Sequence, residues 1–70
     1  MKTYLRQYMD ETGLTYRAAA HKTGLTGQTV YLHASGQQGM SGRAAFAYRQ
    51  AFGLDLEKLL TNRGLNGAED

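Results

Sequence analysis

The sequence contains no cysteine. It can form neither disulfide bonds nor thiolate metal sites, which suits a protein of a reducing cytoplasm. Its 70 residues make one domain at most, and a domain of this size buries only roughly 60% of the surface that its unfolded chain exposes. We therefore expect marginal stability that depends on close helix packing or on a second copy of the chain.

Long apolar runs and catalytic motifs are missing as well. No stretch reaches the roughly 18 consecutive apolar residues of a membrane-spanning helix, and the first residues lack the apolar centre of a signal peptide. The glycines of residues 36–42 lack the lysine and hydroxyl residue of a phosphate-binding loop, and no pairing of a nucleophile with a base stands out. We expect no catalysis, no cofactor, no membrane attachment and no small-molecule ligand.

The two histidines, His21 and His33, do not indicate a metal site, because no cysteine and few acids accompany them. We predict instead that His33 is packed or hydrogen-bonded and that His21 is exposed.

Acidic residues are absent from the middle of the chain, residues 12–54. The same stretch carries Arg17, Lys22, Arg43 and Arg49. The net charge of +2 is too small to indicate a partner, but its distribution makes this region locally basic. The region is therefore either a solvated helix face or a surface that binds nucleic-acid phosphates.

Apolar spacing and capping residues predict five short helices. The first covers residues 3–12, with an apolar stripe at Tyr4, Leu5, Tyr8 and Met9. The others are predicted for residues 16–23, 27–34 and 42–52, and after Asp55 for a segment with Leu56, Leu59 and Leu60. The fourth has apolar residues at helical spacing: Ala45, Phe46, Tyr48, Ala51 and Phe52. The predicted caps are Thr15, Thr26, Ser41 and Asp55 at N-termini and Gly13, Gly24, Gly36 and Gly53 at C-termini.

Glycine-rich residues 36–42 are expected to form an exposed loop. The polar residues from Asn62 onward are expected to fray. The fold class predicted is therefore all-α, a compact five-helix domain over residues 1–62 with a flexible polar tail over residues 63–70.

The second and third predicted helices are joined by Gly24, Leu25 and Thr26. This fits a helix-turn-helix unit, whose turn of three or four residues often contains glycine. Gly24 can adopt the positive φ of a sharp turn, and the small Ala20 allows the two helices to approach closely. Leu25 and Val30 are expected to point inward, which leaves the opposite face of the third helix free.

This layout resembles the lambda-repressor-like helix-turn-helix family, which includes phage Cro proteins and small repressors. The resemblance runs from Leu5 to Leu60 and implies a five-helix domain that binds operator DNA as a dimer, usually to repress transcription. The sequence departs from the family at Tyr16, where a phosphate-binding glutamine is common, and at His33, where an aliphatic residue is usual. Ala18 and Ala19 replace a larger pair. The residues that carry the resemblance are 14–20, 24–26, 28–30, 35–36, 51–54 and 59–60.

The third helix is expected to read base edges in the major groove. Gln28 can pair with adenine, Thr29 can bond a base edge or touch a thymine methyl, and Leu32 can pack on a thymine methyl. Gly27 permits close backbone approach. The alternatives are solvated surface for Gln28 and Thr29 and a core position for Leu32. Tyr31, also placed on this face, either contacts the DNA backbone or covers the edge of the first helix.

A second set of residues flanks this helix and is expected to contact DNA phosphates, which sets register rather than sequence choice. Individually, each of these side chains could instead simply be solvated. The set comprises Tyr16, Arg17, Lys22, Ser35, Gln37, Gln38 and Arg43.

The sequence thus predicts a cytoplasmic, nucleoid-associated transcriptional regulator, a small dimeric repressor of a phage or mobile-element operon. A two-fold dimer would read a near-palindromic operator of double-stranded DNA with half-sites roughly 34 Å apart. The expected dimer interface uses the fifth helix and includes Phe52, Leu56, Leu59 or Leu65. The alternatives are an antitoxin or accessory regulator of a neighbouring gene, for instance in counter-defence, and a helical adaptor that binds protein and not DNA.

Overall fold

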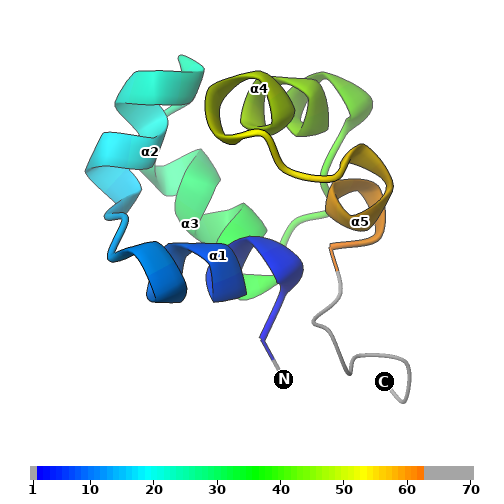
Figure 1. Cartoon of the computed structure of the whole chain (residues 1–70), viewed down its shortest axis with the longest axis horizontal. Helices are drawn as coiled ribbons and strands as arrows, with labels where there is room; N and C mark the ends of the chain where they lie inside the picture. Colours follow the sequence, from blue (N-terminus) through cyan, green and yellow to red (C-terminus); the bar gives the residue numbers. More distant parts are fainter. Residues whose placement is uncertain (1, 63–70) are drawn as a thin grey trace.

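Five α-helices make up the computed structural model, which describes residues 2–62, and no strand occurs in that range. This confirms the predicted all-α class. Thr3 precedes the first helix as its N-cap, and the third helix extends to Ser35, so both differ from the prediction by one residue. The helices are α1 Tyr4–Thr12, α2 Tyr16–Thr23, α3 Gly27–Ser35, α4 Gly42–Phe52 and α5 Leu56–Thr61 (Figure 1).

Both ends of each helix are closed by a side chain or by a left-handed residue. Isolated helices of this length are not stable in water, so these caps and the packing between helices must fix their bounds. The N-caps are Thr3, Thr15, Thr26, Ser41 and Asp55, each of which accepts a hydrogen bond from a backbone amide of the first turn. The left-handed C-caps are Gly13, Gly24, Gly36, Gly53 and Asn62.

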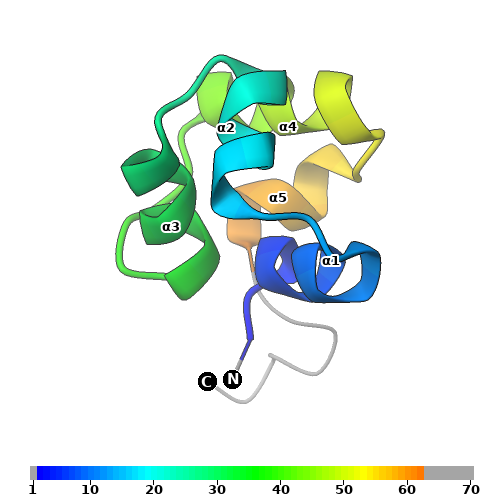
Figure 2. The same ribbon diagram turned by 90° about the vertical axis from the view of Figure 1, so that its left-hand side faces the viewer.

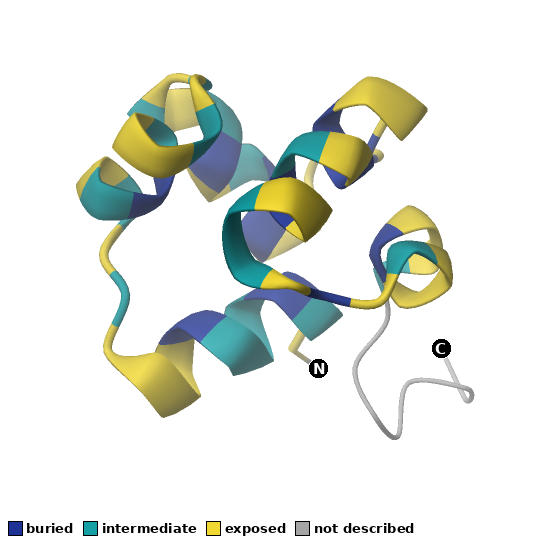
Figure 3. Cartoon of the chain, turned by 45° about the horizontal axis from the view of Figure 1, so that its top comes forward, coloured by how far each residue is buried: buried dark blue, intermediate teal, exposed yellow. Residues whose placement is uncertain are grey.

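The core draws one or more fully buried side chains from every helix (Figure 3). Leu5, Ala19, Val30, Tyr48 and Leu59 come from α1 to α5 in turn, and none of them is exposed to solvent. The pairs of helices in contact are α1 with α3 and α5, α2 with α3 and α4, and α4 with α5. No helix within residues 2–62 combines the length and the apolar character needed to cross a membrane.

Phe46 keeps the helical spacing of α4, and it is 54% exposed. Two expectations about apolar residues are wrong. Leu59 is completely buried within the chain and is therefore not free to form a dimer interface. Met40 is buried, so the loop between α3 and α4 is attached to the core at that residue rather than exposed throughout. Leu65 and the predicted tail lie outside the described residues.

The C-terminal end of α3 is held by side chains from both ends of the described chain. The Thr3 hydroxyl donates to the Ala34 carbonyl at 2.7 Å. The Asn62 amide Nδ2 donates to the His33 carbonyl at 2.7 Å, while its Oδ1 accepts from the Leu5 backbone N–H at 3.1 Å. These bonds satisfy backbone groups that helix ends otherwise leave unpaired. The prediction that Asn62 belongs to a frayed segment is therefore wrong.

Asn62→Ala is expected to lower the free energy of unfolding by about 2 to 4 kcal/mol. The variant loses both amide bonds and places an alanine at a positive φ of 51°. Asn62→Gly keeps the backbone conformation and should cost about 1 kcal/mol less. Urea denaturation measures both values. A loss no larger than that of Gln50→Ala, a change at an exposed position of α4, would contradict the anchoring role of Asn62.

Candidate nucleic-acid interface

The turn between α2 and α3 has the predicted construction. Gly24 adopts a left-handed φ of 81°, and its amide donates to the Ala20 carbonyl at 2.9 Å. Leu25 packs against the core and Val30 is completely buried, so both point inward as expected. The unit therefore presents the opposite side of α3 outward, at the edge of the bundle away from the connection between α4 and α5 (Figure 2).

The outward side of α3 carries polar groups. Gln28, Tyr31 and Ser35 are exposed, and Thr29 is half-buried. The Thr29 hydroxyl accepts a hydrogen bond from the Thr26 hydroxyl at 2.8 Å. A hydroxyl has one donor and two acceptor sites, so Thr29 can still donate to a partner. Gln28 and Thr29 thus have the exposure and hydrogen-bonding capacity that base reading requires.

Gly27 and Leu32 complete the predicted base-reading set. A Cβ atom built on Gly27 would meet nothing within 4 Å, so internal packing does not require glycine there. Leu32 is half-buried and lies outside the core cluster and the side chains packed on it, so the alternative core role is wrong. Both positions are open to an external partner.

Tyr31 is held in place on this face by two neighbours. Its ring meets that of Tyr16 edge-on, with centroids 5.5 Å apart and an interplanar angle of 88°. Its hydroxyl accepts from the Gln37 amide at 3.3 Å. Tyr31 therefore packs on Tyr16 of α2, and 43% of it stays exposed.

The predicted phosphate-contacting residues lie on the surface. Among residues 2–62 the ion pairs all involve Asp10, so the cations Arg17, Lys22 and Arg43 have no carboxylate partner there. Tyr16 is half-buried. The remaining positions, Ser35, Gln37, Gln38 and the three cations, are exposed. The structure therefore leaves these cations available to an external anion.

A cation that sequence reasoning missed lies beside this set. The guanidinium of Arg6 on α1 donates to the Tyr16 hydroxyl and lies 5.6 Å from the centroid of its ring. Asp10 accepts from Lys2 at 2.6 Å and pairs with Arg6 at 3.1 Å. The Arg6–Asp10 spacing of four residues was a visible signal, but the contact with Tyr16 depends on how α1 packs near α2.

A buried pair of polar side chains joins α3 to α4. His33 is 2% exposed, and its Nδ1 lies 2.8 Å from the Tyr48 hydroxyl oxygen. Its Nε2 lies 3.5 Å from the Gln38 amide nitrogen. Burial lowers the pKa of His33 and raises the pKa of Tyr48, because it disfavours the charged form of each. The predicted packed role of His33 is confirmed, as is the exposure of His21.

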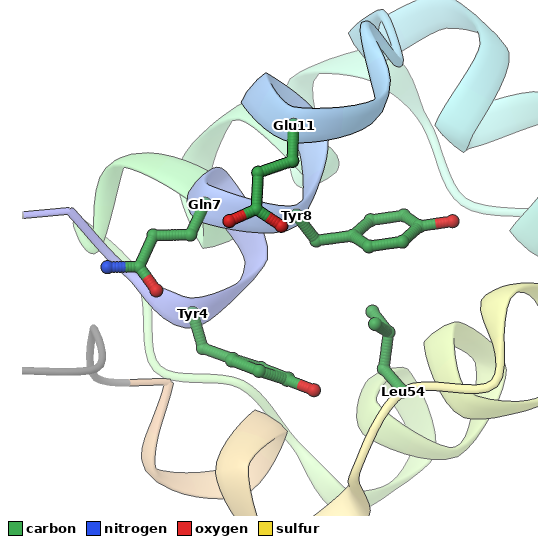
Figure 4. Close-up of a pocket in the computed structure, with 5 residues that line it drawn as sticks. All are labelled: Tyr4, Gln7, Tyr8, Glu11 and Leu54. Atoms are coloured by element: carbon green, nitrogen blue, oxygen red, sulfur yellow. The ribbon is translucent and has the colours of Figure 1, made fainter.

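A pocket of about 220 Å³ lies between α1 and the connection from α4 to α5, lined by Tyr4, Gln7, Tyr8, Glu11 and Leu54 (Figure 4). The Tyr4 ring closes one side, and its hydroxyl accepts from the Asp55 amide at 3.2 Å. The pocket is smaller than the roughly 300–1,000 Å³ typical of sites for small molecules. Within residues 2–62, no group of three or more histidine or acidic side chains is arranged to hold a metal ion.

No family model, curated protein or solved structure matches this chain.

The burial of His33 predicts acid destabilisation that begins near pH 6.5, its ordinary pKa. Above that pH the ring is neutral in both states. Below it the unfolded chain binds a proton that the folded chain does not, so the free energy of unfolding falls by up to about 1.4 kcal/mol per pH unit until the folded pKa is reached. Urea denaturation at a series of pH values measures this slope.

His33→Gln should abolish that slope, whereas His21→Gln, a change of an exposed histidine, should keep it. Between about pH 5 and 6.5 the Asp10 carboxyl does not interfere, because its ordinary pKa is 3.8 and the hydrogen bond from Lys2 lowers that pKa further in the folded chain, so it is ionised in both states. An unchanged slope in His33→Gln would show that another group causes the acid destabilisation.

Proposed function

We propose that this chain is a sequence-specific DNA-binding protein that inserts the exposed side of α3 into the major groove. The observation that carries the proposal is this exposed polar face, together with exposed cations on the adjoining α2 and at the start of α4 that have no carboxylate partner within residues 2–62. In this proposal the five helices form a lambda-repressor-like domain, and the protein acts by binding rather than by catalysis. The B-DNA major groove, about 12 Å wide, admits a single α-helix.

The N-terminal end of α3 is the part best suited to reach base edges. Gly27 and Gln28 are its first two residues, and the open space around Gly27 allows the backbone to approach DNA closely. Gln28 supplies an amide that can pair with adenine, and the Thr29 hydroxyl has a donor left. The fixed ring of Tyr31 lies further along the same face and can contact a base or the adjacent sugar.

The distribution of charged side chains also supports DNA binding with the exposed side of α3 toward the duplex. Arg17 and Lys22 are exposed on α2, which packs against α3, and Arg43 is exposed at the start of α4. Acids are absent from residues 12–54, so nothing in that segment repels phosphates. Such contacts supply affinity and register without reading sequence.

Dimer formation belongs to this proposal, because one short helix contacts few base pairs. Two large apolar side chains are exposed away from the core, Phe46 on α4 at 54% and Leu60 on α5 at 45%. Phe52 and Leu56 are half-buried. A two-fold dimer that covers these residues would bind a near-palindromic operator and repress a promoter by occluding it.

The test begins with duplexes selected from random DNA by the purified chain, followed by two variants. Gln28→Ala is expected to weaken binding to the selected site by about 1 to 3 kcal/mol and to relax choice at one base pair, while random DNA binds as before. Arg43→Ala should weaken all sequences alike and lower the slope of log K against log salt by about 1. Fluorescence anisotropy measures both effects.

Equal weakening of selected and random DNA by Gln28→Ala would remove it from the base-reading set. Failure of the wild-type chain to enrich or bind any duplex would overturn the proposal in favour of a helical adaptor that binds protein.

A further inference from the structure

The contact between Arg6 and Tyr16 brings two hydrogen-bond donors together at the border of the α3 face. Arg6 Nη1 donates to the Tyr16 hydroxyl, and Arg6 Nε lies 3.1 Å from Asp10 Oδ1. The Arg6 side chain is 39% exposed, and Tyr16 is half-buried. The pair adjoins the exposed Tyr31, whose ring lies 5.5 Å from that of Tyr16.

Arg6 and Tyr16 retain hydrogen-bond donors that no partner within the described residues uses. A guanidinium carries five N–H donors, of which Asp10 and Tyr16 use two, so three remain. The Tyr16 hydroxyl accepts from Arg6, so its own hydrogen remains free to donate. Because Arg6 polarises that hydroxyl, its remaining O–H is a stronger donor. The two groups can therefore donate to different oxygens of one anion.

The charge balance around the pair also suits an anion. Asp10 accepts from Lys2 at 2.6 Å in addition to Arg6, so these three side chains carry one net positive charge. The Tyr16–Arg6 bond and the Asp10 contact together fix the planar guanidinium, which is the geometry that favours bidentate binding of phosphate.

We propose that Arg6 and Tyr16 together bind one DNA phosphate, so that α1 contributes to the interface as well as α2 and α3. The inference rests on the proposed function and extends it to a residue outside the helix-turn-helix unit. Tyr16 then links the backbone contact to α3, because the same ring supports Tyr31 on the base-reading face.

The experiment compares Arg6→Gln, Tyr16→Phe and the double variant in binding to a short duplex of mixed sequence. Arg6→Gln is expected to lower the slope of log K against log salt by about 1. Tyr16→Phe keeps the ring beside Tyr31 and should weaken binding several-fold with an unchanged slope. In the Arg6→Gln background, the added cost of Tyr16→Phe should disappear, because the two groups hold one phosphate jointly.

Lys58→Gln is the control, since it removes a cation from α5 that lies over the Tyr4 ring instead, and it should keep the wild-type slope. Arg6→Lys separates charge from structure: it should keep the slope and lose the coupling to Tyr16→Phe. Circular dichroism checks that each variant is folded.

A wild-type slope in Arg6→Gln, or an equal cost of Tyr16→Phe in both backgrounds, would overturn the pair while leaving DNA binding by α3 intact. Absence of any salt-dependent binding by the wild-type chain would overturn the proposed function itself, and the phosphate pair with it.

Discussion

The position of α3 is fixed by hydrogen bonds at its C-terminal end and on its buried side. Its last carbonyls are bound by the Thr3 hydroxyl and the Asn62 amide, each at 2.7 Å, and the His33 side chain reaches the Tyr48 hydroxyl at 2.8 Å. These contacts come from the N-cap of α1, the C-cap of α5 and the middle of α4. Three elements distant in sequence thus hold one short helix that would not be stable alone.

This arrangement explains why one side of α3 can remain polar and exposed. The buried side and the C-terminal end of the helix supply its fixed position, so Gln28, Thr29 and Tyr31 are not needed for the core. The exposed side can then serve recognition, with rigid backbone support of the kind that precise binding sites require. The contact between Arg6 and Tyr16 likewise has two roles: it joins α1 to α2, and it presents hydrogen-bond donors to solvent.

Local signals in the sequence determined much of the fold. Hydroxyl N-caps and glycine C-caps act within one turn of their own helix, so the helix bounds and the turn at Gly24 could be predicted. The burial of Val30 followed from its spacing. Contacts made over long sequence separations could not be predicted: the bonds of Asn62 to Leu5 and His33 and the position of Arg6 on Tyr16 depend on how the helices cross. The exposure of Leu59 was predicted wrongly, because periodicity does not say how wide a buried face is.

An NMR titration of the isotope-labelled chain with a selected duplex would show whether the exposed side of α3 is the surface that meets DNA. The titration follows the backbone amides of all five helices. If α3 enters the major groove, the largest chemical-shift changes are expected at residues 27–32, with smaller ones at Tyr16, Gln37 and Arg43. Shifts confined to α5 or to the pocket beside Tyr4 and Glu11, with α3 unchanged, would contradict it.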